Sequence, residues 1–144
     1  MRLLILFVVF LISGCATLSE TECIHGDWYQ IGQSDGRSGY QLERVEKHRK
    51  ACDKANTDVD VEAYIQGRND GLRYYCTPQN GFDSGLNGSY YSQVCPLELE
   101  QGFLEYYAYG KEIYTVKNEI STVEKEIDKK ENEIKDEDTT DDER

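Results

Sequence analysis

Apolar residues recur at helical spacing along most of this chain, and a strand-like alternation of apolar and polar residues is hard to find. The pattern predicts three helices, over residues 27–50, 59–76 and 97–135. The first should bend near Gly36–Gly39, Thr57 or Asp58 can cap the second, and Pro96 can open the third. A glycine-rich loop, tied by a disulfide, should join the second helix to the third. The predicted fold is therefore a small all-α domain with a long C-terminal helix.

The N-terminus carries a short apolar run, residues 3–12, after a single positive residue. A bilayer-spanning helix needs about 20 apolar residues, so this run has the length of a signal peptide instead. It ends in Leu11-Ile12-Ser13-Gly14-Cys15, which resembles the lipobox of bacterial lipoproteins. The resemblance implies that residues 1–14 are a signal peptide and that Cys15 carries lipid, palmitate included. An ordinary secretory signal with an incidental cysteine is the alternative.

Residues 15–24 are expected to be a tether between the lipid and a folded domain, residues 25–114, which is rich in Tyr, Gly and Cys. Lipidation of Cys15 leaves four cysteines for the domain, and in an exported protein they are expected to form two disulfides. Three pairings are open, of which Cys23–Cys52 with Cys76–Cys95 is preferred and Cys23–Cys76 is the rival. No CxxC spacing indicates zinc binding.

A short repeat marks the first two predicted helices. The segment from Tyr29 to Gly36 parallels that from Tyr64 to Gly71, with glycines four residues apart, and Gly81, Gly85 and Gly88 repeat the spacing once more. Glycines at this spacing share one face of a helix, which favours close approach of two backbones. Loop glycines placed by chance are the alternative, particularly over residues 79–95, where turn-forming residues gather.

The third helix has an unbroken heptad seam, aliphatic in its distal part, residues 111–135. Glutamate occupies each flanking g position of that part: Glu112, Glu119, Glu126 and Glu133. Paired copies would oppose Glu to Glu, which disfavours a strong homomeric coiled coil. A lone charged helix, packing on the protein's own domain, a basic partner helix and weak self-association remain open. Residues 136–144 are expected to be a disordered acidic tail.

The chain is acidic, with 28 Asp and Glu against 16 Lys and Arg in 144 residues and a formal charge of −12. Nucleic-acid binding needs clustered basic charge and is excluded as a class. The Gly32-x-Ser34-x-Gly36 motif matches a nucleophile elbow, but no strand precedes it and the repeat replaces Ser34 by Asn69. Asp35 and Asp70, equivalent in the repeat, are expected to cap helices or pair with arginine rather than catalyse.

Other candidate chemistry is weak. His25, Asp27 and His48 could hold a metal only if the fold gathered them, and the acidic stretch 58–62 lacks the glycine of a calcium loop. The tyrosine pairs are expected to pack in the core, although they could stack on a sugar or a partner. No catalytic residue, metal or cofactor is therefore expected.

The tryptophan, glycines, tyrosines and cysteines occur in an order that resembles a bacterial lipoprotein family, catalogued as domain of unknown function family 2799. The likeness rests chiefly on Asp27-Trp28-Tyr29, Asp35-Gly36, Gly71-Leu72, Tyr75-Cys76-Thr77-Pro78, Cys95-Pro96 and Gly110. It implies a lipidated envelope protein and brings no catalytic residue.

The prediction for function is a non-enzymatic structural or interaction protein, lipid-anchored at the periplasmic face of the outer membrane. Ala16, in place of an aspartate that would favour the inner membrane, indicates the outer one. An envelope protein is the expected partner, through residues 111–135. A periplasmic glycan- or small-molecule-binding module built on the tyrosine and glycine faces is the alternative.

Overall fold

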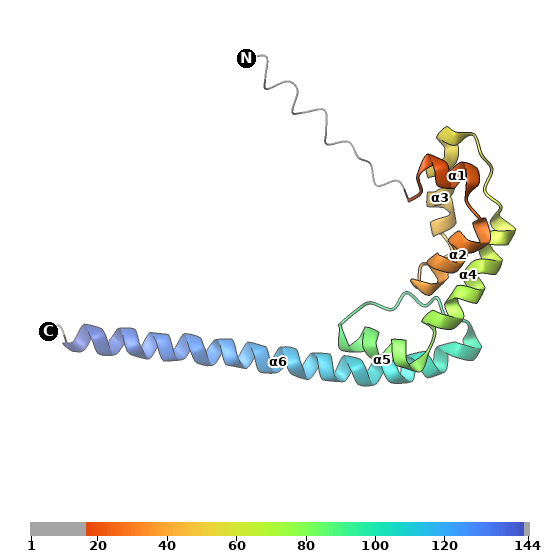
Figure 1. Ribbon diagram of the computed structural model, residues 1–144. Coiled ribbons are helices and arrows are strands. Elements are labelled where there is room, and N and C mark those ends of the chain that lie inside the picture. The colour runs from red at the N-terminus through yellow and green to blue at the C-terminus, as the bar shows by residue number, and fades with distance from the viewer. Residues whose placement is uncertain (1–16, 143–144) are drawn as a thin grey trace, which may run out of the picture. The chain divides into compact units, whose positions relative to one another are not determined.

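A computed structural model describes the backbone of residues 17–142 and the side chains of residues 17–135, and within this range it confirms the all-α prediction. Its helices are α1 (Glu20–His25), α2 (Trp28–Arg37), α3 (Arg44–Cys52), the 3-10 helix η1 (Asp53–Ala55), α4 (Val61–Tyr75), α5 (Pro78–Leu86) and α6 (Leu97–Asp142) (Figure 1). None of these helices combines the length and the apolar character that crossing a bilayer requires. The predicted signal peptide, residues 1–14, and Cys15 lie outside the described residues.

The predicted helix over residues 27–50 is two helices joined by a turn, so the expectation of a bend is corrected. The backbone of Gly39 has φ +69°, a left-handed conformation that ends α2. The ring of Tyr75 covers this glycine so closely that an added Cβ would collide with it. The chain then crosses to Arg44, where α3 begins.

Two segments predicted to be irregular contain helices. The tether, residues 15–24, includes most of α1, which is closed by a capping box between Ser19 and Glu22. The expected glycine-rich loop includes α5, whose first turn is capped by Thr77 and opened by Pro78. In both segments local capping offsets a composition that favours turns.

Helix α6 continues to Asp142, so the predicted end at residue 135 and the predicted disorder of residues 136–142 are corrected, whereas residues 143–144 lie outside the described residues. No glycine or proline follows Gly110 to interrupt it. Near its distal end Lys129 and Lys130 both pair with Glu133, at 3.8 and 2.6 Å. At 1.5 Å per residue its 46 residues extend about 69 Å.

The predicted single domain, residues 25–114, is instead divided into two compact units. Unit 1 contains α1 to α4 together with Ser92–Pro96, and unit 2 contains Cys76–Tyr91 with α6. The division follows the packing, because α2 pairs with α4 and α5 pairs with α6. Each pair buries its own helix faces.

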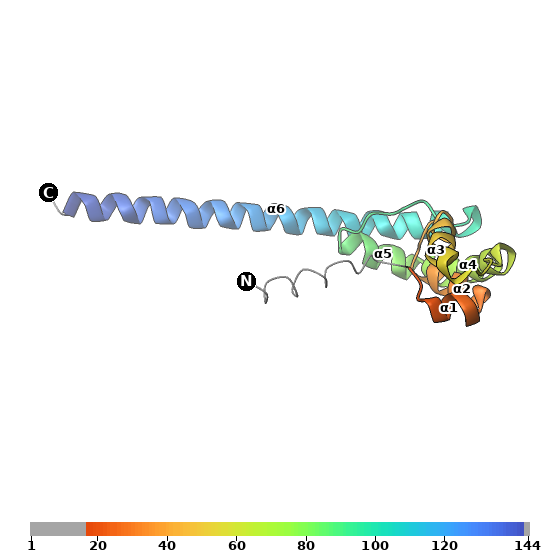
Figure 2. The same ribbon diagram turned by 90° about the horizontal axis from the view of Figure 1, so that it is seen from above.

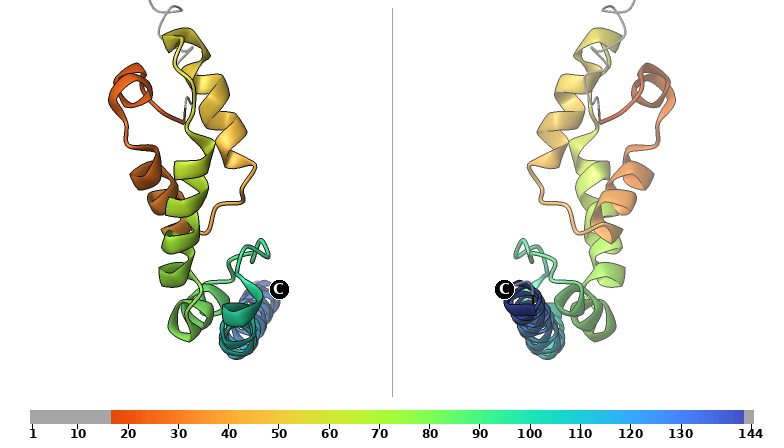
Figure 3. Two further views of the ribbon diagram at one scale, coloured as in Figure 1. Left: turned by 90° about the vertical axis from the view of Figure 1, so that its right-hand side faces the viewer. Right: turned by 90° about the vertical axis from the view of Figure 1, so that its left-hand side faces the viewer.

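In unit 1, α2 and α4 lie side by side and cross at four glycines (Figure 3). A Cβ on Gly32 or Gly36 would collide with a backbone carbonyl of α4, and one on Gly67 or Gly71 with a carbonyl of α2. The contacts are reciprocal: Gly32 faces the Tyr64 carbonyl, whereas Gly67 faces that of Tyr29, the counterpart of Tyr64 in the repeat. The predicted close backbone approach is confirmed.

In unit 2, α5 lies along the first turns of α6 (Figure 2) and uses the same crossing. Gly81 and Gly85 face carbonyls of α6, and Gly110 faces the Phe82 carbonyl of α5. The turn that follows the helix is repeated as well. Gly88 has φ +69° and is covered by the ring of Tyr114, just as Gly39 has φ +69° and is covered by the ring of Tyr75. Unit 2 is thus a second version of the α2–α4 pair.

The cores of the units differ. Buried Cys23, Trp28, Val45, Cys52 and Tyr64 form the core of unit 1, while unit 2 buries Phe103 beneath Tyr91 with ring centroids 4.7 Å apart. The predicted Cys23–Cys52 disulfide is present, and Cys76 and Cys95 are disulfide-bonded as well. The rival Cys23–Cys76 pairing is not formed.

Replacing both Cys23 and Cys52 by alanine should lower the free energy of unfolding of unit 1 by about 3.5 kcal/mol, because the bond closes a long loop in the unfolded chain. The sequence separation of 29 residues sets this size. Trp28 is the only tryptophan, so its fluorescence during denaturation reports on unit 1. An unchanged midpoint in the double variant would contradict the prediction.

Candidate functional site

A buried carboxylate lies at the centre of unit 1. Asp35 of α2 is 6% exposed and accepts hydrogen bonds from the Tyr64 hydroxyl at 2.7 Å and the Arg44 Nε at 3.1 Å. Its Oδ2 also lies 2.7 Å from His48 Nε2. The other nitrogen of that ring, Nδ1, is 2.9 Å from the Thr17 hydroxyl. These five residues are called the Asp35 cluster.

Helical spacing brings the cluster together. Asp35 lies on the same face of α2 as the crossing glycines Gly32 and Gly36, which draws it toward α4. On α3, Val45, His48 and Cys52 are the buried residues, three and four positions apart, so the imidazole points inward with the core side chains. The two helices and the first turns of α4 therefore converge on one carboxylate.

The surroundings of Asp35 favour its charged form. Burial by itself raises its pKa, but hydrogen bonds from His48 and Tyr64 and the nearby charge of Arg44 outweigh burial and leave the pKa below its ordinary value. Burial and the same carboxylate raise the pKa of the Tyr64 hydroxyl, which therefore stays protonated and donates.

A buried arginine lies beside the cluster. Arg68 of α4 is 8% exposed and donates to the Tyr40 carbonyl from Nε at 3.0 Å and Nη2 at 2.8 Å. Burial lowers the pKa of Arg68, whereas the negative charges of Glu43 and Asp35 oppose the shift. Arg44 also lies over the Tyr40 ring, 3.8 Å from its centroid. The turn between α2 and α3 is therefore held by two arginines.

The repeat places a similar but exposed pair on the other side of the helix crossing. The Tyr29 hydroxyl donates to Asp70 Oδ2 at 2.9 Å, as Tyr64 does to Asp35. Asp35 and Asp70 thus form two separate tyrosine–aspartate pairs and share no site. Arginine pairing was expected and Asp35 does pair with one, but the partner is Arg44 rather than an arginine of α2 or α4.

Unit 2 shows that the fold does not require the cluster. By the glycine crossings, Ser84 takes the place of Asp35 and Phe103 that of Tyr64. Phe103 is fully buried and packs against the rings of Tyr91 and Tyr107. The polar cluster of unit 1 is an addition to a helix pair that also packs with apolar residues.

A cleft of about 410 Å³ opens over the cluster, lined by Thr17, Ser34, Asp35, Arg44 and His48 among others. Ser34 is exposed at its edge, and its backbone carbonyl accepts a hydrogen bond from the Ser38 hydroxyl at 3.0 Å. A hydroxyl–imidazole–carboxylate chain can relay a proton or fix the hydroxyl in place. In the described part of the chain, no three His, Cys, Asp or Glu side chains gather as metal ligands, and His48 is engaged with Thr17 and Asp35.

Sequence reasoning singled out Asp35 and His48 separately but not their contact, and it missed Thr17, Arg44 and Tyr64 as partners. The helical spacing of His48 with Val45 and Cys52 was a usable signal of its burial. Thr17 carried no such signal, because its segment reads as a tether.

A family model described as "Protein of unknown function (DUF2799)" matches residues 27–112, or 86 of the 144 residues. The chain belongs to the DUF2799 family. The matched region of this DUF2799 protein includes both glycine crossings and every member of the Asp35 cluster except Thr17. Most of the distal α6 helix lies beyond it. Comparisons with curated proteins and with solved structures give no match.

Proposed function

We propose that this DUF2799 protein is a non-enzymatic lipoprotein of the cell envelope, anchored through Cys15 at the periplasmic face of the outer membrane. Its distal α6 helix binds a partner protein. The lipobox-like sequence supports the anchor, and the two disulfides fit an oxidising compartment. The observation that carries the partner proposal is an exposed apolar stripe on α6.

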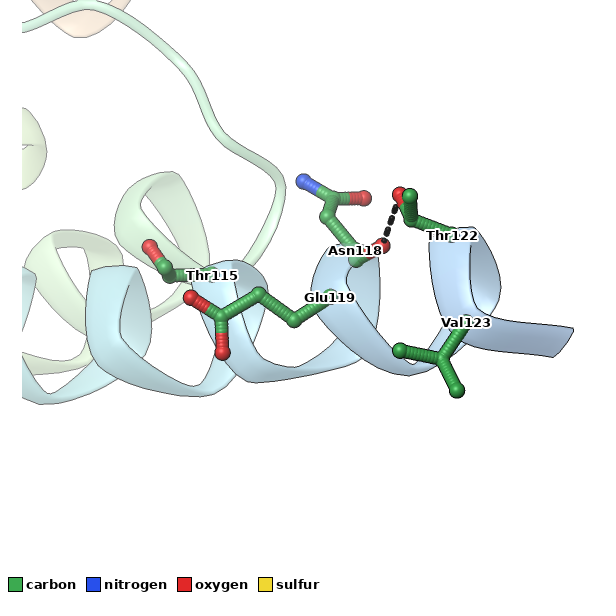
Figure 4. Close-up of a pocket in the computed structure, with 5 residues that line it drawn as sticks. All are labelled: Thr115, Asn118, Glu119, Thr122 and Val123. Carbon is green, nitrogen blue, oxygen red and sulfur yellow. Dashed lines mark hydrogen bonds between the residues drawn. The ribbon is translucent and has the colours of Figure 1, made fainter. Parts of the chain in front are cut away.

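The stripe consists of aliphatic side chains at heptad spacing: Ile113, Val116, Ile120, Val123, Ile127 and Ile134. Each is 39–58% exposed, although side chains of this kind gain free energy by burial. Figure 4 shows a shallow groove beside the stripe, which shares Val123 with it and is otherwise lined by Thr115, Asn118, Glu119 and Thr122 of the same helix. A groove on one helix suits a second helix better than a small ligand.

Charge selects the partner. The glutamates beside the stripe would face glutamates of a second copy in most pairings, which disfavours strong self-association. A partner helix with lysine or arginine beside its own apolar seam would match both features. A basic amphipathic helix of an envelope protein is therefore the proposed occupant.

Photocrosslinking in intact cells tests the proposal. A photoreactive amino acid at Val123 or Ile127 should join α6 to a lysine- or arginine-rich helical segment of another protein, identified by mass spectrometry of the joined peptides. Lys125 lies on the opposite face of the same helix and serves as the control position. Partner capture should be lost in a Val116→Asp/Ile120→Asp variant. Equal capture from Lys125, or only α6 joined to α6, would contradict it.

The alternative function is a ligand-binding module built on the tyrosine and glycine faces. The glycine faces are not available to a ligand. The crossing glycines face neighbouring backbones so closely that no ligand can enter between them. Exposed tyrosines such as Tyr74 and Tyr90 remain on the surface, and neither of them lines the cleft over the Asp35 cluster.

A further inference from the structure

A basic stripe runs along α3 and η1, in contrast to the acidic character of the chain. Residues 44–54 contain five basic side chains (Arg44, Lys47, Arg49, Lys50, Lys54) against two acidic ones (Glu46, Asp53), a local charge of +3 in a chain of charge −12. Lys47, Lys50 and Lys54 are three and four residues apart, so they follow one face. That face lies on the side of α3 opposite the buried residues Val45, His48 and Cys52, and it is turned toward solvent.

The three lysines are available for binding. All are exposed, and among the side chains described none of them forms an ion pair. The two arginines of the same segment are engaged, because Arg44 pairs with Asp35 and Arg49 with Glu46 at 2.6 Å. The stripe called the α3 lysines therefore consists of Lys47, Lys50 and Lys54.

The Asp35 cluster holds α3 against the N-terminal segment that follows the proposed anchor residue. His48, the neighbour of Lys47, binds the Thr17 hydroxyl at 2.9 Å. Thr17 is two residues from Cys15, a span of at most about 7 Å for an extended chain. The segment after Thr17 is also fixed, since the Cys23–Cys52 disulfide ties α1 to the end of α3. A lipid on Cys15 would therefore be joined to the segment held against α3 by only two residues of chain.

Acidic groups near the N-terminus do not cancel the stripe. Glu20 and Glu22 lie in the first turn of α1, and Glu22 accepts hydrogen bonds from the Ser19 backbone at 2.8 Å and hydroxyl at 2.7 Å. Its carboxylate is therefore committed to the helix cap and to the N-terminal end of the α1 dipole. Among the described side chains, the α3 lysines form no comparable hydrogen bond or ion pair.

We propose that the α3 lysines bind the anionic headgroups of the membrane in which Cys15 is anchored, so that unit 1 is seated on the lipid surface in one orientation. The proposal rests on the anchoring in the proposed function. Its chemistry is electrostatic: each basic residue near an anionic leaflet favours the bound orientation by about fivefold.

Lysine footprinting of the lipidated full-length chain tests the orientation. The protein is reconstituted in phosphatidylcholine vesicles with and without phosphatidylglycerol, and acetylation of each lysine is followed by mass spectrometry. The α3 lysines should react about fivefold more slowly when phosphatidylglycerol is present, and high salt should restore their reaction. Lys117, Lys125 and Lys129 of α6 are internal controls whose rates should not fall.

A matched pair of variants separates specific seating from general crowding. In Lys47→Gln/Lys54→Gln, the remaining Lys50 should lose its protection, whereas it should keep it in Lys117→Gln/Lys125→Gln. Flotation with the vesicles reports anchoring independently. A chain that floats but whose α3 and α6 lysines react alike on both vesicles would overturn the seating alone. A chain that does not float would overturn the anchoring and the seating together.

Discussion

Replacing Gly110 by alanine should destabilise unit 2 by about 3 kcal/mol, whereas the same change at Gly102 in the same helix should stabilise it by about 0.5–1 kcal/mol. A Cβ at Gly110 would collide with the Phe82 carbonyl and the Leu86 amide nitrogen of α5, and neither backbone atom can move without separating the helices. A Cβ at Gly102 would meet only the Pro78 Cγ, at 3.6 Å, an ordinary contact. Removing a flexible glycine there favours the helix.

Hydrogen exchange across α5, residues 78–86, measures both effects, because the amides of this helix are released when the pair opens. Exchange should accelerate in Gly110→Ala and slow or stay unchanged in Gly102→Ala. The two variants add the same methyl group to the same helix, so intrinsic propensity cannot explain opposite signs. Similar exchange in both variants would mean that α5 and α6 are not in glycine-mediated contact.

Replacing Asp35 by alanine should lower the free energy of unfolding of unit 1 by about 3–5 kcal/mol, and Asp70→Ala should cost less than about 1 kcal/mol. Both aspartates accept a hydrogen bond from a tyrosine of the other helix. Loss of Asp35, however, leaves the buried side chains of His48 and Tyr64 and the half-buried Arg44 without their acceptor. The Tyr29–Asp70 hydrogen bond is exposed, so the Tyr29 hydroxyl can bind water instead. Denaturation followed by Trp28 fluorescence compares the two, and equal losses would contradict a special role for the buried carboxylate.

The contribution of Asp35 should also depend on pH in a defined direction. Because its pKa is lowered in the folded state, the charged carboxylate adds stability that is fully present above the unfolded pKa of about 3.9. This stability is lost as the pH falls through the lower folded value. The part of the advantage of the wild type over Asp35→Asn that comes from the carboxylate charge should therefore shrink as the pH falls below about 4. An advantage that persists unchanged in acid would show that the carboxylate is not stabilised by its neighbours.

The sequence predicted the crossings well and the boundaries of helices poorly. Glycines four residues apart can be recognised in the repeat, because a helix brings such residues to one face whatever its partner is. The end of α2 could not be recognised in the same way. The left-handed turn at Gly39 is fixed by the ring of Tyr75, which comes from a helix that begins 22 residues later.

The candidate site was predictable only in its parts. Asp35 and His48 stood out as residues, but their contact depends on the crossing angle of α2 and α4 and on where α3 begins. Thr17 could not be foreseen, since its hydroxyl gains a partner only when α1 folds back and the Cys23–Cys52 bond holds it. The pairing of α5 with α6 could not be predicted for a similar reason. Glycines disfavour an isolated helix and therefore indicate a loop, and α5 becomes stable only through its contact with the backbone of α6.

The sequence by itself determined the helical class, the internal repeat, the Cys23–Cys52 bond as the preferred pairing and the apolar seam of α6, because these depend on residue type and spacing along one chain. Only the tertiary structure decided that the domain consists of two pairs of helices that cross at glycines. It also decided that a single aspartate of unit 1 contacts a histidine, a tyrosine and an arginine. Contacts of that kind depend on distances between segments that are far apart in sequence, and those distances are set by how closely two backbones can approach.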